Sequence, residues 1–337
     1  MNTSLPSADP AWLTAITFCR VRVMLRAQQA GSLRGFYSSL LRGWLGHQMQ
    51  RLCVCRFLGS SGFAHCSLKK SCSWGVFFGE LPSSTALRPY LIELDDLRSD
   101  HRRAFIRGEI FPVTLLLIGQ GIAHLDSLVS AFMIDGGTVA LDRQQLPFRV
   151  RAVETLQADG SAVPYFQDNT RVGEPVVLTL AALSRHGVPQ VTDHLTVEFL
   201  TPLALKHDNV LVRQAQDFSF PLLLRAVLRR LYDLAATVCG YRDAKPDFAS
   251  LLALADTVER THAHLQWVDF PRFSSRQQSL MDFGGLVGRI GFRGKFAPLL
   301  SYLLLGAELH LGRHTSFGFG RFRCVFSALG QPDSAAE

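Results

Sequence analysis

The chain has 337 residues, and its 35 Lys and Arg against 28 Asp and Glu give a formal net charge of +7. Hydrophobic residues at 47% and charged residues at 19% exclude a disordered or fibrous chain and predict two domains with substantial cores. The polar start lacks the basic segment and apolar run of a secretory signal, and the apolar runs are too short to cross a membrane. We therefore expect a cytoplasmic protein without a membrane partner.

Strand-like and helix-like segments alternate in the first half of the chain. Their periodicity predicts strands at 14–27, 90–94, 109–118 and 148–154, and helices at 39–53 and 121–134. Their order along the chain is β-α-β-β-α-β. Residues 156–190 are rich in turn formers and are predicted to hold a hairpin and the interdomain linker. We expect a first domain over residues 1–190.

The second half repeats this order with clearer signals. It has predicted strands at 194–201, 264–270, 280–294 and 320–327, and predicted helices at 218–239, 248–262 and 296–312. Pro221 and Pro298 stand near the starts of two of these helices, where proline is tolerated, and Gly240 follows one of them as a stop. The pattern predicts an α+β fold with two ferredoxin-like (RRM-like, βαββαβ) domains in tandem. The second domain is expected over residues 191–330, with a tail at 331–337.

The positive charge is concentrated in two zones. No Asp or Glu lies between Pro10 and Gly79, whereas nine basic residues do, and subtracting these nine from 35 leaves 26 basic against 28 acidic residues. Between Gly284 and Cys324, Glu308 is the single acidic residue against six basic ones. Because most of these are arginines, whose planar bidentate donors suit phosphate, a polyanion partner is predicted. A solvated basic surface is the alternative.

Four segments in order along the chain carry a family resemblance. They are VEFLTPLALK (197–206), FSFPLLLRAVLRRL (218–231), WVDFPRFSSRQ with DFGGLVGRIGF (267–292) and LGAELHLGRHTSFGFGRF (305–322). Together with LLRGWLGHQMQRLC (40–53), they resemble the CRISPR-associated pre-crRNA processing endoribonucleases of the RAMP superfamily. The resemblance implies two ferredoxin-like domains that bind the repeat portion of a CRISPR transcript and cut it once without a metal.

The glycine-rich segment 311–324 lies between the last predicted helix and the last predicted strand. A dinucleotide-binding motif has its glycines after the first strand instead, so no nucleotide cofactor is expected. Gly312, Gly318 and Gly320 permit positive φ and close backbone approach, so their amides can face phosphates in a nest. A tight loop packed on its own sheet, with Phe317 and Phe319 in the core, is the alternative.

The first basic zone has no carboxylates to hold the ions of a two-metal nuclease. RNA carries its own nucleophile in the 2′-hydroxyl, so a base, an acid and a cation suffice. His47 is the candidate base, because on a helix Gly43 and Arg51 lie one turn to either side and give access and a cation. The resemblance also implies a histidine base on this first helix. A histidine bonded to neighbouring backbone or packed at the domain interface is the alternative.

Tyr37 and Arg51 complete the predicted catalytic set, Tyr37 to orient the ribose and Arg51 to neutralise developing charge. A buried tyrosine and an arginine that only positions phosphate are the alternatives. For His314, plain RNA contact is the favoured interpretation, and a position near the scissile phosphate, if the domains face each other, is the alternative. The predicted RNA-binding residues are Arg34, Arg42, Lys69, Lys70, Arg289, Arg293, Lys295, Gly312, Arg313, His314, Thr315, Ser316, Gly318, Gly320 and Arg321.

The predicted connector contains four cysteines within a span of twenty residues: Cys53, Cys55, Cys66 and Cys72. Their spacing departs from that of a paired CxxC zinc site, so unligated thiols are expected and a structural zinc site is the alternative. Neither a cofactor nor a metal is predicted.

The predicted function is that of a metal-independent endoribonuclease that processes pre-crRNA by 2′-hydroxyl attack, leaving 2′,3′-cyclic phosphate and 5′-hydroxyl ends. One alternative is a non-catalytic RAMP subunit that grips CRISPR RNA inside an effector complex. Another is a ferredoxin-like RNA-binding module of a different pathway. The expected partners are CRISPR repeat RNA or crRNA, and other Cas proteins of such a complex.

Overall fold

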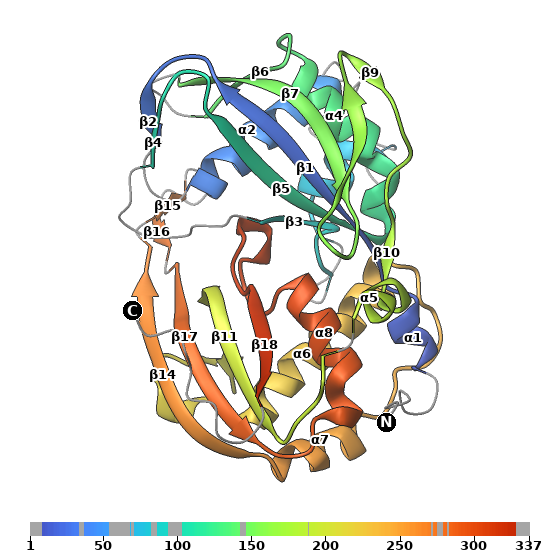
Figure 1. Cartoon of the computed structure of the whole chain (residues 1–337), viewed down its shortest axis with the longest axis vertical. Helices are drawn as coiled ribbons and strands as arrows, with labels where there is room; N and C mark the ends of the chain where they lie inside the picture. Colours follow the sequence, from blue (N-terminus) through green and yellow to red (C-terminus); the bar gives the residue numbers. More distant parts are fainter. Residues whose placement is uncertain are drawn as a thin grey trace.

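The computed structural model shows two α+β domains stacked along the long axis of the molecule (Figure 1). The residues it describes are 9–33, 37–53, 68, 71–81, 86–93, 103–141, 146–187, 189–270, 272–274, 279–281 and 283–327. In this part of the chain, no helix has the length and apolar character that a membrane crossing requires.

The N-terminal domain is built on an antiparallel sheet in the order β3-β5-β1-β7. Its strands are β1 (Thr17–Ala27), β3 (Tyr90–Glu93), β5 (Ile110–Ile118) and β7 (Pro147–Leu156). Helices α2 (Tyr37–Leu52) and α4 (Leu125–Met133) cover one face (Figure 1). Alternation in β1 explains this, because Val21, Val23 and Leu25 are buried while Arg20 and Arg22 point to the other face.

The C-terminal domain repeats the same path with the order β14-β17-β11-β18. Its strands are β11 (His194–Leu203), β14 (Glu259–Asp269), β17 (Gly284–Arg293) and β18 (Phe322–Ser327), and its helices are α6 (Phe220–Thr237), α7 (Ala249–Asp256) and α8 (Leu300–Leu309). Ser219 caps α6 by accepting the amide of Leu222, and Pro221 occupies its first turn. The tandem ferredoxin-like fold predicted from element order is confirmed.

One predicted boundary is wrong. The helix expected over 248–262 ends at Asp256, and β14 begins at Glu259. The reason is tertiary, because residues from Glu259 onward pair along almost the whole length of β17. Pairing with a central strand outweighs the weak helical preference of that segment.

Several short elements were not predicted from the sequence. They are α1 (Ala11–Thr14), α3 (Ser73–Phe78), α5 (Leu180–His186), β2 (Gly31–Leu33), β4 (Arg103–Phe105), β6 (Thr138–Ala140), β10 (Leu178–Thr179), β12 (Lys206–His207), β13 (Val210–Leu211), β15 (Arg272–Ser274) and β16 (Ser279–Met281), whereas β9 (Thr170–Arg171) belongs to the hairpin that was expected within 156–190. Segments this short carry too few periodic positions to give a pattern.

The two domains share one hydrophobic cluster. Helix α1 precedes the first strand, yet it packs against the C-terminal domain (Figure 1). The Trp12 ring stacks on Tyr302 with centroids 5.9 Å apart and meets Phe248 edge-on at 5.7 Å. Residues on both sides of the expected boundary at 190 therefore contribute to this cluster, which favours a fixed orientation of the domains.

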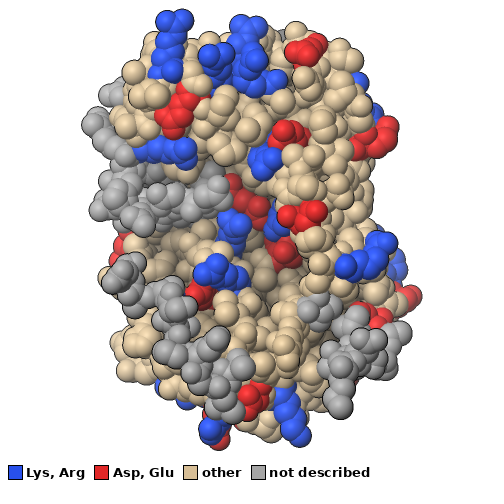
Figure 2. All heavy atoms as spheres, in the orientation of Figure 1, with Lys and Arg blue, Asp and Glu red and all other residues tan. Residues whose placement is uncertain are grey.

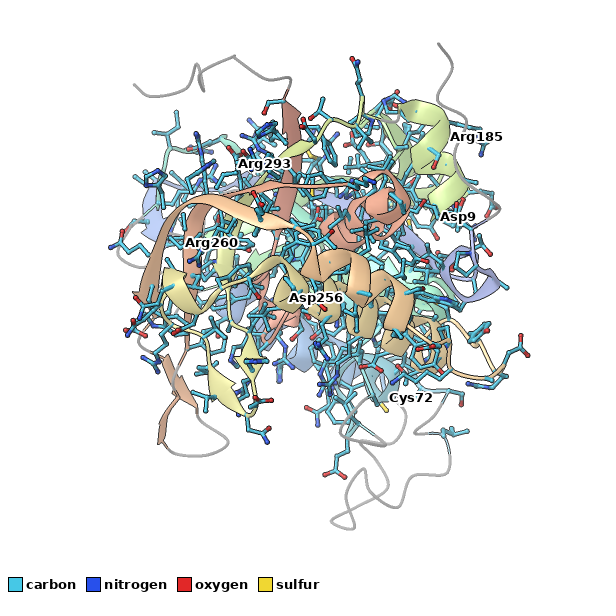
Figure 3. The ribbon with its side chains drawn as sticks, turned by 90° about the horizontal axis from the view of Figure 1, so that it is seen from below. Asp9, Cys72, Arg185, Asp256, Arg260 and Arg293 are labelled. Atoms are coloured by element: carbon cyan, nitrogen blue, oxygen red, sulfur yellow. The ribbon has the colours of Figure 1, made fainter. Side chains whose placement is uncertain are left out.

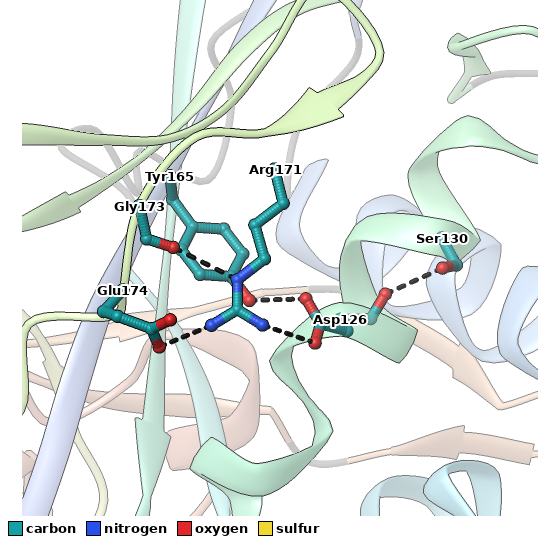
Figure 4. A network of polar contacts seen from close by, with 6 residues as sticks. All are labelled: Asp126, Ser130, Tyr165, Arg171, Gly173 and Glu174. Carbon is teal, nitrogen blue, oxygen red and sulfur yellow. Dashed lines mark hydrogen bonds and ion pairs between the residues drawn. The ribbon is translucent and has the colours of Figure 1, made fainter.

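A polar network fastens the outer hairpin of β8 (Ala162–Gln167) and β9 to the start of α4 (Figure 4). The Tyr165 hydroxyl donates to Asp126 at 2.5 Å, and Arg171 bridges Asp126 at 3.4 Å and Glu174 at 2.5 Å. The Arg171 guanidinium also lies 5.3 Å from the centre of the Tyr165 ring. These contacts hold the hairpin against the helix layer.

Candidate nucleic-acid interface

The glycine-rich loop, residues 310–321, joins α8 to β18 and is closed by its own backbone. The amide of Leu311 donates to the carbonyl of Gly320 at 2.9 Å, and the amide of Gly320 donates to Pro202 at 2.9 Å. Gly320 has φ +78°, and a Cβ there would lie 1.8 Å from the Leu311 carbonyl oxygen. Only glycine fits this position.

The amides of two loop glycines are already used inside the protein. The amide of Gly318 donates to Thr315 at 2.9 Å, and that of Gly320 donates to Pro202. The expected phosphate nest is therefore not formed by these two amides, because loop closure takes them. Gly312 has φ +75°, and a Cβ on Gly312 would lie 2.4 Å from the carbonyl oxygen of Ala204. The alternative of a tight, packed loop describes this backbone.

The side chains of the glycine-rich loop form a small aromatic core with the neighbouring strand ends. Phe317 and Phe319 are buried and pack with Phe270 and Phe283. The His314 ring lies 4.1 Å from the Phe283 ring, and its backbone is left-handed with φ +64°. His314 is thus half-buried against an aromatic ring, and its contact with RNA stays a prediction.

The glycine-rich loop docks on the first long helix of the other domain. The Ser38 hydroxyl of α2 donates to the Phe317 carbonyl at 2.8 Å in a buried hydrogen bond. The Arg42 guanidinium lies over the Phe317 ring at 4.5 Å and over Phe78 at 5.6 Å. Segments from opposite ends of the chain, one from each basic zone, therefore meet at this contact.

His47 lies on the solvent side of α2. Its side chain is exposed, and one turn earlier Gly43 is also exposed, with no atom within 4 Å of where its Cβ would be. His47 stands five positions beyond Arg42, which rotates it by about 140° around the helix axis. It therefore points away from the docked loop, and a single groove that holds both the loop and the imidazole stays a prediction.

Arg51, one turn after His47, is paired. Its guanidinium donates to both Asp135 oxygens at 2.7 and 2.9 Å and to Gln48 at 2.7 Å. The hydrogen bonds from Arg51 lower the pKa of Asp135, and the charge of His47 contributes to this shift. The carboxylate cancels the cation that was expected to stand free beside His47. This pair could not be predicted from the sequence, because Asp135 lies more than eighty positions away from Arg51.

Tyr37 is buried at the start of α2, with 6% of its surface exposed, and its ring meets Phe111 edge-on at 5.4 Å. This position favours the alternative of a core tyrosine over a ribose-orienting one. Of the other predicted residues, Arg34, Lys69 and Lys70 lie outside the described residues. Arg313 and Lys295 are exposed, and Thr315 and Ser316 are half-buried.

A buried charge cluster joins the domains next to the glycine-rich loop. His310 is fully buried, with Nδ1 3.1 Å from the Phe319 carbonyl and Nε2 3.5 Å from the Glu93 carboxylate. Arg20 lies 3.5 Å from Glu93 and contacts Glu308 of α8. Burial raises the pKa of Glu93, but His310 and Arg20 more than reverse this and leave it at about 2.

None of these residues was singled out from the sequence. Two signals pointed to them: Glu93 ends an otherwise apolar strand, and Glu308 is the single acidic residue of the second basic zone. Arg321, predicted to bind RNA, contributes its charge to the same cluster and helps to lower the pKa of Glu93. Arg321 is half-buried and therefore lies both at the domain junction and at the surface.

Many basic residues of the two zones are neutralised by carboxylates from distant segments. Arg22 pairs with Glu154 at 2.8 Å, Arg293 pairs with Glu259 at 2.5 Å, and Arg289 lies 3.0 Å from Glu198. Basic and acidic side chains accordingly lie next to one another on the hollowed face in Figure 2. A segment without acidic residues is thus not a surface without acidic residues, because the fold brings carboxylates of other segments beside its arginines.

Two of the four connector cysteines lie in the part of the chain that the structure describes. Cys53 and Cys72 lie with their sulfurs 3.2 Å apart, whereas Cys55 and Cys66 fall outside the described residues. Among the described residues, no three His, Cys, Asp or Glu side chains gather into a possible metal site. The described part of the chain thus contributes two thiols here.

The two halves of the chain match two family models. A model described as an N-terminal domain (AF_1859_N) matches residues 15–177. The model of the CRISPR-associated endoribonuclease Cas6 matches residues 197–322, from β11 into β18, and includes the glycine-rich loop. The C-terminal half of the chain matches the Cas6 endoribonuclease family. The family resemblance noted in the sequence is confirmed, and the matched residues include all of β14 and β17, most of β11 and the first residue of β18. No curated protein matches the chain significantly.

Solved structures share the fold at low identity. A chain of the partial Cas6-RT-Cas1–Cas2 complex aligns at TM-score 0.58 and 14% identity, over 97% of this chain and 48% of that one. Product complexes of Thermus thermophilus Cas6 (TTHB231) and of Cas6 (TTHA0078) align at TM-scores 0.54 and 0.51 and identities of 14% and 18%, each over 92% of this chain and 99% of theirs. This chain spans about half the length of the first of these proteins. The likeness supports the tandem ferredoxin-like fold.

Proposed function

We propose that this protein binds CRISPR repeat RNA and cleaves it without a metal ion. The observation that carries the proposal is the match of residues 197–322 to the Cas6 endoribonuclease family, combined with an exposed histidine on the first long helix of the other domain. Histidine exchanges protons near neutral pH, and RNA supplies the nucleophile. Such a reaction needs no bound cofactor.

His47 is the proposed general base. It removes the proton of a ribose 2′-hydroxyl, whose oxygen then attacks the adjacent phosphorus. The bond from phosphorus to the 5′-oxygen breaks, and that oxygen takes up a proton. The products are a 2′,3′-cyclic phosphate and a 5′-hydroxyl, and neither water nor electrons are consumed.

The surroundings of His47 suit an approach by RNA. Gly43 leaves one flank open, because nothing lies where its side chain would be. On the other flank, Arg51 is paired with Asp135. A phosphate of the RNA must therefore compete with the Asp135 carboxylate for the Arg51 guanidinium. The exposed Arg313 and Lys295 are proposed to contact the RNA backbone elsewhere on the chain.

The reaction chemistry is tested with a labelled CRISPR repeat RNA in the presence of EDTA. Cleavage at one position that leaves a 2′,3′-cyclic phosphate is expected, together with no cleavage of an RNA carrying a single 2′-deoxy nucleotide at that position. Binding of the deoxy substrate should match that of the normal one, because only the nucleophile is removed. Cutting of the deoxy substrate would contradict 2′-hydroxyl attack.

A non-catalytic RNA-binding subunit is the second candidate. The pairing of Arg51 with Asp135 and the burial of Tyr37 favour it, because two of the three predicted catalytic side chains are then occupied in the fold. Tight binding of the repeat RNA without any cutting would support this candidate. One aligned structure is a complex of Cas6 with RT, Cas1 and Cas2, so we extend the proposal to Cas protein partners. A cytoplasmic location, as expected from the sequence, is part of the proposal.

A further inference from the structure

Three arginines of β1 lie on the face of the N-terminal sheet that α2 and α4 leave open. They are Arg20, Arg22 and Arg26, and the residues that alternate with them are buried in the core. Towards the domain junction these charges are neutralised, since Arg20 contacts Glu93 and Arg22 pairs with Glu154. Arg26, near the end of β1 that is remote from the C-terminal domain, has no carboxylate partner among the described residues (Figure 1).

Four exposed arginines from three segments meet at this outer end of the sheet. Arg26 lies directly across the strands from Arg149 of β7. Arg151 occupies the irregularity where β7 has one residue more than β1, and Arg107 lies in the turn before β5. The amide of Gly108 donates to the carbonyl of the last residue of β1 at 2.8 Å and holds this turn in place. In Figure 2, basic side chains gather at this end of the N-terminal domain.

The outer arginine patch, Arg26, Arg107, Arg149 and Arg151, is not neutralised by any carboxylate in the part of the chain that the structure describes. The neighbouring Glu109 lies 3.7 Å from Arg103 and accepts the amide of Ile106 at 3.0 Å. Like charges at directly opposite positions of two strands repel each other and destabilise a sheet. A bound anion would relieve this repulsion between Arg26 and Arg149.

Exposed apolar side chains adjoin the outer arginine patch. Ile110 of β5 lies directly across from Arg26 with 41% of its surface exposed, and Ile106, next to Arg107, is 72% exposed. Guanidiniums suit phosphates, and isoleucine side chains suit the apolar faces of bases. A single strand of RNA offers both groups, whereas a duplex keeps its base faces stacked inside. The surface therefore favours a single-stranded segment over a duplex or a free phosphate ion.

We propose that the outer arginine patch binds the backbone of a single-stranded segment of the RNA substrate, away from the cleavage position. This inference rests on the proposed function, since the RNA is the molecule that His47 is proposed to cut. Helix α2, which carries His47, covers the opposite face of the same sheet. The nucleotides at the patch and at His47 are therefore separated by a sheet and a helix layer. The patch adds affinity and touches no reacting atom.

The test compares the full-length wild type with two variants that each lose three positive charges. The patch variant is Arg26→Gln, Arg149→Gln, Arg151→Gln, and the control variant is Arg185→Gln, Arg225→Gln, Arg242→Gln. The control arginines are exposed and lie on α5, on α6 and after α6, and Arg185 lies at the periphery in the view from the end of the C-terminal domain (Figure 3). Because the net charge of the two variants is equal, the comparison isolates the location of the lost charges.

The affinity for repeat RNA is measured at several salt concentrations. The patch variant should bind at least about tenfold more weakly at about 0.1 M salt, and its salt slope should be smaller by about 2, since three single-strand phosphate contacts contribute about 0.7 each. The control variant should bind like the wild type. The single-turnover cleavage rate at saturating RNA should be equal in all three proteins, because the patch touches no reacting atom.

Wild-type affinity and salt slope in the patch variant would overturn the patch and leave the proposed cleavage reaction standing. An equal loss in the control variant would also overturn it, because net charge alone would then explain the effect. Weaker binding of the patch variant to double-stranded RNA only would contradict the single-stranded assignment. A wild type that does not bind repeat RNA would overturn the proposed function together with the patch.

Discussion

The Ser38 hydroxyl donates a 2.8 Å hydrogen bond to the carbonyl of Phe317, and so joins two residues 279 positions apart. Ser38 is fully buried at the start of α2, and Phe317 lies in the glycine-rich loop of the Cas6 domain. This bond brings the two ends of the chain together. It also makes the loop part of the domain junction.

Replacement of Ser38 by Ala should lower the free energy of unfolding by about 1–3 kcal/mol, because it leaves the buried Phe317 carbonyl without this donor. Denaturant unfolding measures this value. Ser130→Ala is the control, since its hydroxyl bonds to the Asp126 carbonyl within one exposed helix turn. An equally small loss in the free energy of unfolding for both variants would show that the hydrogen bond from Ser38 to Phe317 contributes little to stability.

Gly320→Ala should be far more destabilising than Gly160→Ala. Both glycines have φ near +79°, but a Cβ at Gly320 would clash with the Leu311 carbonyl oxygen, whereas nothing lies within 4 Å at Gly160. The control should cost about 1–2 kcal/mol from backbone strain alone, and Gly320→Ala at least about 2 kcal/mol more. Equal losses in thermal unfolding would show that the loop opens without cost.

Stability should depend on the ionisation of Glu93. Its pKa is lowered from 4.5 to about 2, so the carboxylate stabilises the fold above about pH 4.5 and this contribution is lost as the pH falls through about 2. Glu93→Gln should therefore reduce the melting temperature near neutral pH, and the difference from wild type should shrink as the pH approaches about 2. The exposed Glu174→Gln serves as the control and should show almost no difference. A constant difference at every pH would contradict the assignment.

The pair of Arg51 and Asp135 sets how much positive charge is offered beside His47. Because both side chains are partly exposed, Asp135→Asn should change stability by less than about 1 kcal/mol, yet it should strengthen RNA binding at low salt. Arg51→Gln should weaken binding and reduce the salt slope by about 0.7, as the loss of one single-strand phosphate contact would. Titrations of repeat RNA at several salt concentrations measure both effects. An unchanged slope in Arg51→Gln would remove Arg51 from the interface.

The fold was predictable because its main signals are local. Leu41, Leu45 and Met49 recur at helical spacing in α2, and Val21, Val23 and Leu25 alternate in β1. These patterns give the element type and order, and the order gives the tandem ferredoxin-like fold. The short elements, such as the four-residue α1, could not be predicted because they depend on packing against the other domain.

The site was less predictable because its partners are distant in the sequence. Arg51 was correctly placed one turn from His47, but Asp135, which holds it, belongs to another segment. The same holds for Arg22, whose partner Glu154 lies on the neighbouring strand β7 but 132 positions later in the sequence. Counting charges along the sequence therefore does not reveal the ion pairs that form when distant segments meet in the fold.

His47 is the residue on which the proposed reaction depends. A general base contributes about 10²- to 10⁴-fold to a rate, so its loss should be measurable even if binding and folding are unaffected. The exposed His186 at the end of α5 offers a matched control for the removal of a surface imidazole.

The decisive measurement is the single-turnover rate of repeat RNA cleavage in EDTA for the wild type, His47→Ala and His186→Ala. The rate should fall at least about 100-fold in His47→Ala, with RNA affinity unchanged within about threefold, and should stay at the wild-type value in His186→Ala. Cleavage by His47→Ala at close to the wild-type rate would show that another group removes the 2′-hydroxyl proton.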